Sequence, residues 1–262
     1  MKASVAPLCR SEVTDDAFLG GKLKVLQPAR GYRAGIDAVL LAAAVTPFAN
    51  RETRVLDVGA GVGTIGLCVA RRLEDAEVVL FEREPELVEL AKENIARNQF
   101  TGRVRACQGT VGGSAEDLDC EGLAAGSFTH VLANPPYYAA GAATRSASKL
   151  KSASHVMDNG DFSIWGRFLA RMARPGGQVL VVHMAEALAE VLAGLNGRFG
   201  AIKVLPIRPR PGRKAHRIIV SGIKGSRAPL SVLPGFILHG DGNAFTSEAQ
   251  AILRDGGGLV LD

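Results

Sequence analysis

A run of four residues, Asn134-Pro135-Pro136-Tyr137, offers the groups needed to activate a weak nitrogen nucleophile. An amino nitrogen conjugated to a ring or a carbonyl reacts poorly because its lone pair is delocalised. The side-chain oxygen of Asn134 and the backbone carbonyl of Pro135 can accept its two N–H bonds and bias it toward a tetrahedral, attacking geometry. The prolines fix φ and remove two backbone donors, and Tyr137 can stack on a planar group. The run predicts a reaction that transfers a chemical group to a planar, sp² amino nitrogen. Most of the acceleration would come from holding that nitrogen in line with the group it attacks.

The place of this run in the chain separates two interpretations of it. A polar-Pro-Pro-aromatic turn can be an ordinary loop. Here it directly follows the apolar run Phe128–Ala133, which we expect to be the fourth strand of a parallel sheet. Doubly wound sheets bind ligands at the carboxyl ends of their strands. We therefore interpret the four residues as catalytic.

A glycine-rich turn follows an earlier apolar run. Gly59, Gly61 and Gly63 come after an expected buried strand that contains Asp57, and a helix is expected to begin at Thr64. Glycine lets the backbone adopt positive φ and pass close to a ligand. A dinucleotide-binding pattern would need glycine where Thr64 stands, so the spacing departs from that pattern.

An acidic residue at the end of the next expected strand adds to this turn. Glu82 comes 23 residues after Gly59. A carboxylate there can accept both ribose hydroxyls of a nucleoside, whereas a charge at a strand end can also simply lead into the next helix. Together with the glycine turn, Glu82 favours a nucleoside site.

These motifs resemble those of class I methyltransferases. The turn after Asp57 is similar to their first motif, and the run that begins at Asn134 matches the N-P-P-aromatic motif of amino-methyltransferases acting on adenine, guanine or glutamine. The resemblance implies S-adenosylmethionine as cofactor, with Asp57 near its sulfonium or amino-acid end. The residues that it assigns to the cofactor are Asp57, Gly59, Gly61, Gly63, Glu82 and Asn134.

Three further segments look like a narrower family, the bacterial tRNA1(Val) adenine N6-methyltransferases. Residues 31–41 resemble the entry segment of that family, and residues 245–248 and 252–254 resemble its C-terminal end. The family implies an adenine next to the anticodon as target. It also implies Arg33 and Asp37 close to the methyl donor, although Asp37 suits the first turn of a helix equally well.

One position departs from the pattern of this group. Its members often carry an acid after the third strand, where it contacts the adenine amino group of the donor. This chain has Gln108 and Gly109 there. Gln108 or a backbone carbonyl must replace that contact, or the contact is absent.

The frame that positions these residues is predicted by alternating apolar runs and helical periods. The stretch 85–99 has apolar residues on one helical face, and such alternation indicates βαβ units. Two last runs, 202–207 and 217–223, leave no room for a helix between them. We expect an α/β, doubly wound, Rossmann-like fold with a mostly parallel seven-stranded sheet and a C-terminal antiparallel hairpin. The parallel runs are Arg54–Val58, Glu77–Glu82, Arg103–Gln108, Phe128–Ala133 and Gln178–His183.

One methyltransferase domain is expected over residues 18–262, after a flexible N-terminal tail over residues 1–17. Residues 139–157 form a basic insert without acids, directly after the catalytic run. The insert suits a lid over a substrate and equally a plain basic helix. Its basic residues are Arg145, Lys149, Lys151 and His155.

Charge is divided unequally along the chain. Residues 1–121 carry a net charge of −3 and residues 122–262 carry +8. No acid occurs between Glu190 and Asp241, where nine Lys and Arg residues do. A one-sided basic field suits a polyanionic partner, and a merely solvated basic face is the alternative. Four of the nine cations lie in the expected hairpin turn, residues 208–214, where phosphates can dock.

Other classes of protein and site are disfavoured. No apolar run reaches the ~18 residues needed to cross a bilayer, so we expect no membrane partner and a cytoplasmic protein. The four cysteines are widely spaced and lack a histidine at ligand spacing. That spacing disfavours a zinc or other metal site and a disulfide framework.

The sequence therefore predicts an S-adenosylmethionine-dependent methyltransferase acting on N6 of an adenine in tRNA, with the base flipped out. Protein glutamine N5-methylation uses the same motif. Methylation of a small molecule, including O-methylation, is another alternative, but oxygen nucleophiles usually need a base or a metal. A non-catalytic RNA-binding module of the same fold is a third, and it predicts no binding of the donor.

Overall fold

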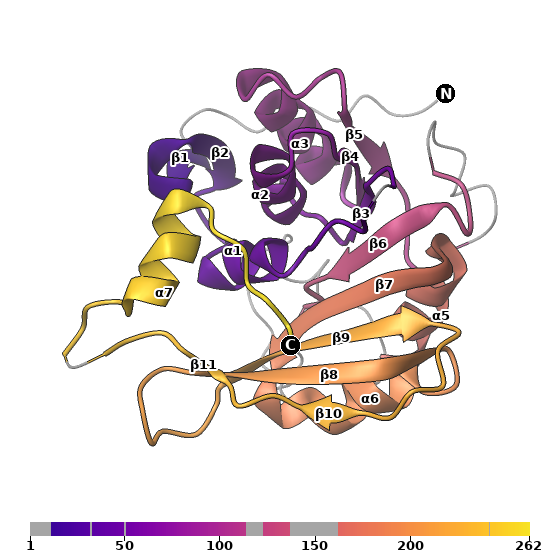
Figure 1. The fold of residues 1–262 in the computed structure, drawn as a ribbon. Helices are drawn as coiled ribbons and strands as arrows, with labels where there is room; N and C mark the ends of the chain where they lie inside the picture. The colour runs from indigo at the N-terminus through magenta and orange to yellow at the C-terminus, as the bar shows by residue number, and fades with distance from the viewer. Residues whose placement is uncertain (1–11, 32, 50, 114–122, 137–161, 241) are drawn as a thin grey trace.

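The fold is seen in a computed structural model of the chain, built around one large sheet (Figure 1). The structure describes residues 12–31, 33–49, 51–113, 123–136, 162–240 and 242–262. The predicted α/β, mostly parallel architecture is confirmed. No helix of these described residues is long and apolar enough to cross a membrane.

Five parallel strands form the centre of the sheet. They are β3 (Arg54–Val58), β4 (Glu77–Glu82), β5 (Val104–Gln108), β6 (Phe128–Ala133) and β7 (Ala173–Met184). They lie in the order β5-β4-β3-β6-β7. Three of them match their predicted bounds, because each is a short apolar run flanked by polar residues. β7 begins earlier than predicted, since Ala173 already pairs with Phe128 across an irregularity in register.

A hairpin closes one side of the sheet, as predicted. β8 (Phe199–Arg208) and β9 (Arg217–Lys224) pair antiparallel, and β9 also pairs antiparallel with β7. β8 therefore runs in the same direction as β7. Two strands of two residues each, β10 (Ser231–Val232) and β11 (Phe236–Ile237), pair with β8 and extend the sheet beyond the seven predicted strands.

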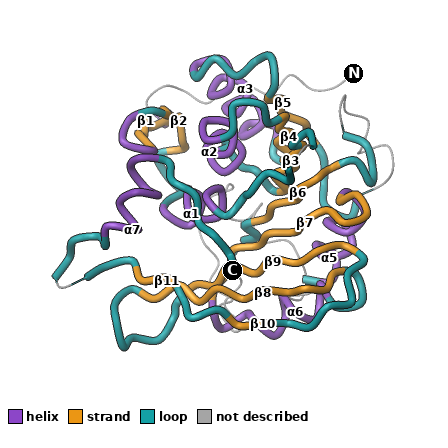
Figure 2. Tube along the Cα trace, in the orientation of Figure 1, coloured by secondary structure: helices purple, strands orange, loops and turns teal. Residues whose placement is uncertain are grey.

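Helices cover both faces of the sheet, as a doubly wound fold requires (Figure 2). On one face, α1 (Ile36–Ala43), α2 (Thr64–Arg72) and α3 (Pro85–Arg97) share one buried apolar cluster with the strands. On the other face, α5 (Ser163–Met172) and α6 (Leu188–Leu195) share a second cluster. Leu67 and Leu169, one from each cluster, are fully buried. Burying such a side chain stabilises the fold by about 1.5–3 kcal/mol.

The structure differs from the predicted tail over residues 1–17. β1 (Val13–Phe18) and β2 (Leu23–Pro28) form an antiparallel hairpin joined by a 3-10 turn, η2 (Leu19–Gly21). Gly20 and Gly21 in that turn have φ of +67° and +93°, which glycine adopts without strain. Residues 1–11 lie outside the described residues.

Two asparagines of α3 bind the edge of this hairpin. Asn94 accepts from the N–H of Leu26 at 2.7 Å and donates to its carbonyl at 3.0 Å. Asn98 makes the same pair of bonds with Lys24, at 3.1 and 2.7 Å. Four residues along a helix rise about 6 Å and two along a strand about 6.6 Å, so the spacings match. The two amides act as a substitute for a further strand.

The C-terminal segment packs against α1 and η2. It contains α7 (Ser247–Gln250), which continues into a π-helical turn, η5 (Ala251–Asp255). Thr246 caps α7 by accepting from the N–H of Ala249 at 3.1 Å. A 3-10 turn, η4 (Ala185–Ala187), leads from β7 into α6.

The structure leaves the predicted basic insert untested and contradicts the expectation for the cysteines. The basic insert 139–157 lies outside them. Cys107, at 2% exposure, is disulfide-bonded, contrary to the disfavoured disulfide.

Candidate active site

Neighbouring strand ends bring the two sequence motifs together. Val58, the last residue of β3, lies opposite β4 on one side and opposite Ala133 of β6 on the other. Glu82 lies opposite Gln108 of β5. The glycine turn, Glu82, Gln108 and the turn that begins at Asn134 therefore all leave the same, carboxyl edge of the sheet. The neighbours of β3 lead away in opposite directions along the sheet, and this switch point is where doubly wound sheets bind ligands.

The glycine turn is held against the sheet by one carbonyl of β4. The N–H groups of Gly59 and Ala60 both donate to Phe81 O, at 2.8 and 3.0 Å. Gly59, Gly61 and Gly63 have φ of +69°, +57° and +88°. Other residues adopt this region only with strain, so the turn depends on its three glycines.

The surroundings of these glycines show which part of the turn is open. A Cβ added to Gly59 would lie 2.8 Å from the ring of Trp165. One added to Gly63 would lie 2.6 Å from Leu80. Among the described residues, a Cβ on Gly61 would meet nothing within 4 Å. A ligand can therefore lie against the backbone at Gly61.

The Glu82 carboxylate lies at this open part of the turn. Its Oε2 accepts from Gly61 N at 2.8 Å, and its Oε1 accepts from Arg83 N and Glu84 N at 2.8 and 3.0 Å. Glu82 is 8% exposed. A ligand hydroxyl that approaches Gly61 reaches an ionisable acceptor already oriented by backbone amides.

Gln108 continues the same edge. The N–H of Gly109 donates to Glu82 O at 2.8 Å, and the exposed amide of Gln108 donates to Arg83 O at 3.4 Å. The residues predicted to replace the missing acid thus lie beside Glu82. Their contact with a cofactor stays a prediction.

Asp57 lies beneath the turn rather than on its open side. It is fully buried, and its Oδ2 accepts from Gly66 N, near the start of α2, at 2.9 Å. Burial raises the pKa of Asp57 to about 7; the Gly66 N–H bond opposes this shift, and the charge of Glu82 adds to it. Within the described residues, Asp57 Oδ1 has no hydrogen-bond partner. Asp57 supports the turn and α2 from below, and its predicted place beside the cofactor stays a prediction.

The predicted catalytic turn begins beside the glycine turn. Asn134 is half-buried and Pro135 is buried. Asn134 directly follows the β6 residue that pairs with the last residue of β3, so the two turns start on adjacent strands. Pro135 and Pro136 have no N–H to donate, which leaves carbonyl acceptors at this turn. Tyr137 lies outside the described residues.

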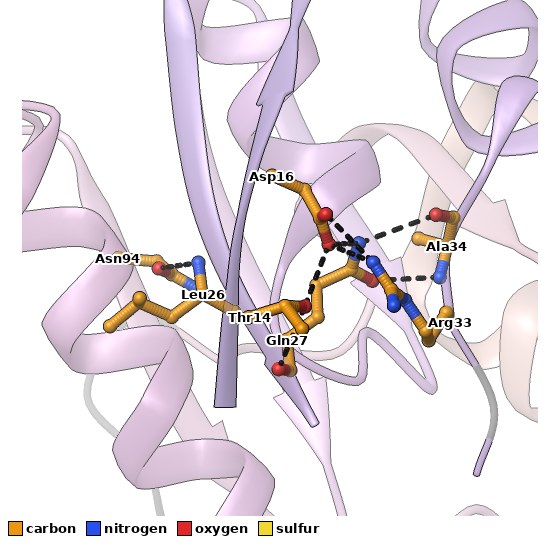
Figure 3. A network of polar contacts seen from close by, with 7 residues as sticks. All are labelled: Thr14, Asp16, Leu26, Gln27, Arg33, Ala34 and Asn94. Atoms are coloured by element: carbon orange, nitrogen blue, oxygen red, sulfur yellow. Dashed lines mark hydrogen bonds and ion pairs between the residues drawn. The ribbon is translucent and has the colours of Figure 1, made fainter. Parts of the chain in front are cut away.

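Arg33 and Asp37 are each held by a partner that sequence reasoning missed. Arg33 Nη2 contacts Asp16 Oδ2 at 2.6 Å, in a network that includes Gln27 (Figure 3). Arg217 Nε donates to Asp37 Oδ2 at 2.9 Å. Since Arg217 is the first residue of β9, this ion pair joins α1 to the hairpin. The predicted nearness of both residues to the donor stays a prediction.

Two more residues that support the glycine turn were not found from the sequence. Asn94 is fully buried and also donates to Val62 O at 3.1 Å, so one amide binds the turn and β2 together. Trp165 of α5 packs against Gly59 from the other face. The available signals were two asparagines four residues apart on one helix and the single tryptophan of the chain.

Comparison with known proteins finds methyltransferases. The family model of the methyltransferase small domain matches residues 37–207. A solved structure of a predicted O-methyltransferase from Agrobacterium tumefaciens is 33% identical, with a TM-score of 0.71, and the match covers 86% of this chain and 98% of that one.

Curated relatives point to tRNA enzymes. A tRNA1(Val) (adenine(37)-N6)-methyltransferase from Shewanella sp. is 26% identical over 190 residues, which is 72% of this chain and 76% of the relative. One of the same name from Dickeya chrysanthemi is 24% identical over 229 residues, 85% of this chain and 87% of the relative.

Proposed function

The chain belongs to the methyltransferase small domain family and is an S-adenosylmethionine-dependent methyltransferase, and from this premise we propose that it methylates a planar amino nitrogen, N6 of an adenine in tRNA. The observation that carries the choice of nitrogen is the position of Asn134, directly after β6, the strand that pairs with β3 before the glycine turn. Its amide oxygen accepts hydrogen bonds and takes no proton at neutral pH.

The described residues at the carboxyl edge fit the cofactor. The backbone at Gly61 is open to a ligand, and the Glu82 carboxylate beside it suits two ribose hydroxyls. Gln108, in register with Glu82, suits the adenine end. S-adenosylmethionine supplies a methyl group made electrophilic by the positive charge on its sulfur. We propose that these three residues bind and orient it.

The acceptor nitrogen needs orientation more than it needs a base. Asn134 Oδ1 and the Pro135 carbonyl accept its two N–H bonds and turn its lone pair toward the methyl group. The proton can leave after transfer, so the turn works with two neutral acceptors. Tyr137 provides a stacking surface in the same proposal. Holding the two reacting atoms in line supplies most of the acceleration.

Oxygen is the acceptor in the name of the Agrobacterium relative, whereas His183, a described histidine near the turn, supports nitrogen instead. An oxygen nucleophile usually needs a base within reach. His183 lies near the end of β7, where its Nδ1 accepts from the N–H of Met184 at 2.9 Å. Burial lowers the pKa of His183, opposed by that backbone bond. A histidine held in this way is a poor proton acceptor for a substrate hydroxyl.

The choice of tRNA is supported by two independent features. The curated relatives are named for tRNA1(Val) adenine 37. The second half of the chain carries the acid-free basic stretch between Glu190 and Asp241, which suits a polyanion. Action on tRNA also implies a cytoplasmic protein.

The test is radiolabelled methyl transfer from S-adenosylmethionine onto total tRNA from a strain that lacks this protein, followed by nucleoside analysis. We expect label in N6-methyladenosine, and label formed about 10²–10³-fold more slowly with the Asn134→Ala variant. A thermal shift with the cofactor must show that this variant still binds the donor. Label on a ribose or other hydroxyl would refute nitrogen as the acceptor, and label only in protein or small molecules would refute tRNA as the substrate.

A further inference from the structure

The loop between β8 and β9 carries cations at the catalytic edge of the sheet. β8 runs in the direction of β6 and β7, so its last residue, Arg208, lies at the carboxyl edge, and β9 starts there with Arg217. Residues 208–217 hold five Lys and Arg residues and no acid. The densest positive charge of the acid-free stretch is therefore on the side of the sheet from which the Asn134 turn leaves.

Three of these cations surround a shallow hollow. The hollow has a volume of about 400 Å³. Arg213 and Lys214 are exposed, and Arg208 is half-buried. Its lining residues are Pro206, Arg208, Gly212, Arg213, Lys214 and Ala215.

Two other cations at this edge are already paired with acids. Arg217 is paired with Asp37 and Arg33 with Asp16. By contrast, none of the three cations of the hollow forms an ion pair within the part of the chain that the structure describes. Their charge is available to an incoming anion.

The loop is also held in place at its base and its tip. Arg208 O accepts from Leu238 N at 2.9 Å, and His216 N donates to Ile207 O at 3.2 Å. Arg210 donates to Asn243 Oδ1 at 2.7 Å. A loop held in this way loses less backbone freedom when it binds a ligand.

We propose that this hollow binds backbone phosphates of the RNA strand that carries the methylated base. The proposal rests on the proposed function. Guanidinium and ammonium groups are the usual partners of phosphate oxygens, and contacts to phosphate set the register of a nucleic acid without reading its sequence. Residues 206–217 contain no Phe, Tyr or Trp on which bases could stack. The loop therefore positions the strand, and the Asn134 turn acts on the base.

The test is binding of fluorescently labelled tRNA by the double variant R213A/K214A over a series of salt concentrations. Loss of two phosphate contacts makes the slope of log K against log salt less negative by about 1.5–2 and weakens binding about tenfold to a hundredfold near 0.1 M salt. The matched control is R171A/R227A, which removes two exposed arginines at the opposite, amino edge of the sheet. We expect the control to bind as the wild type does.

Enzyme kinetics separate this inference from the proposed function. We expect R213A/K214A to raise KM for tRNA with kcat and the affinity for S-adenosylmethionine unchanged. Equal affinity and salt slope in R213A/K214A and in the control would overturn the phosphate site, even if adenine is methylated. Wild-type protein that does not bind tRNA would overturn it as well. Wild-type protein that binds tRNA through this loop but does not label adenine would overturn the proposed function alone.

Discussion

The two halves of the carboxyl edge differ in how their charges are compensated. On the cofactor half, at the ends of β3, β4 and β5, Asp57 and Glu82 are buried and accept from backbone N–H groups. On the acceptor half, the β8–β9 loop exposes Arg213 and Lys214, which have no ion-pair partner within the described residues. The first half is preorganised for a small ligand of one shape. The second half leaves charge open for a large polyanion.

Because of this difference, a sequence motif can reveal the cofactor half but not the acceptor half. A site made of backbone amides and positive-φ glycines requires particular residues at particular spacings, so a motif reveals it. A phosphate-binding surface requires only enough cations in one area. The cofactor is therefore shown by the family, whereas the substrate has to be proposed.

The largest effect is expected at the point where the halves meet. Asn134→Ala should lower kcat about 10²–10³-fold, the usual cost of removing one preorganised hydrogen-bonding group from a reaction site. The affinity for S-adenosylmethionine should stay the same, because the open turn and Glu82 are untouched. Single-turnover kinetics measure the rate of methyl transfer, and calorimetry measures the affinity for S-adenosylmethionine. A parallel loss of donor affinity would show that the halves are not separable at Asn134.

The next largest effect is a dependence of the protein's stability on pH, which comes from Asp57 in the cofactor half. Burial raises the pKa of Asp57 from 3.8 to about 7, so the folded protein binds this proton more tightly than the unfolded chain. Its contribution to stability is greatest below about pH 4 and is lost as the pH rises through 7, by at most about 4 kcal/mol. Asp57→Asn cannot titrate and keeps an acceptor for Gly66 N.

Urea denaturation of the wild type and of Asp57→Asn between pH 4 and pH 8 measures this contribution of Asp57 to stability. The stability of the wild type relative to Asp57→Asn should fall as the pH rises through that range. Titration of carboxylates that do not interact with Asp57 affects both proteins alike and cancels in the difference. A constant difference would mean that Asp57 is not isolated from water or from a partner as its burial indicates.

A smaller effect is expected at the open part of the turn. Glu82→Gln should weaken S-adenosylmethionine binding about 10- to 100-fold, since hydrogen bonds to a charged group contribute about 1.5–3 kcal/mol. The affinity for tRNA should not change. The matched control is Glu89→Gln, an exposed carboxylate paired with Lys92 on α3. Unchanged donor affinity in Glu82→Gln would remove this residue from the cofactor half.

Much of the frame could be predicted because local pattern and global fold agree in it. The bounds of β3, β4 and β6 follow from short apolar runs, and the fold class then places their ends at one edge. β1 could not be predicted in the same way. Its polar residues, such as Asp15, give no apolar alternation, and its hairpin is completed by side-chain amides of α3 rather than by another strand.

Some contacts of the site could not be predicted from the sequence for a related reason. Arg217 lies 180 residues from its partner Asp37, and no local pattern links two charges at such a distance. Trp165 acts on the glycine turn from the other face of the sheet. Such contacts depend on tertiary packing, so they follow from the structure and not from spacing along the chain.

The smallest expected effect concerns whether Arg33 belongs to the cofactor half. Its ion pair with Asp16 is partly exposed, at 41% and 28% for the two side chains. Breaking such a pair costs about 0.2–1 kcal/mol, which is the destabilisation expected of Arg33→Ala. Asp16→Ala should cost more, because Asp16 also accepts from Thr14 and Gln27. The resemblance places Arg33 close to the methyl donor, and on that basis we expect only Arg33→Ala to weaken donor binding, by a few-fold. Calorimetry that measures the affinity of both variants for S-adenosylmethionine tests this expectation. If they weaken the donor equally, Arg33 acts through Asp16 and the β1–β2 hairpin, and the cofactor half ends at the glycine turn.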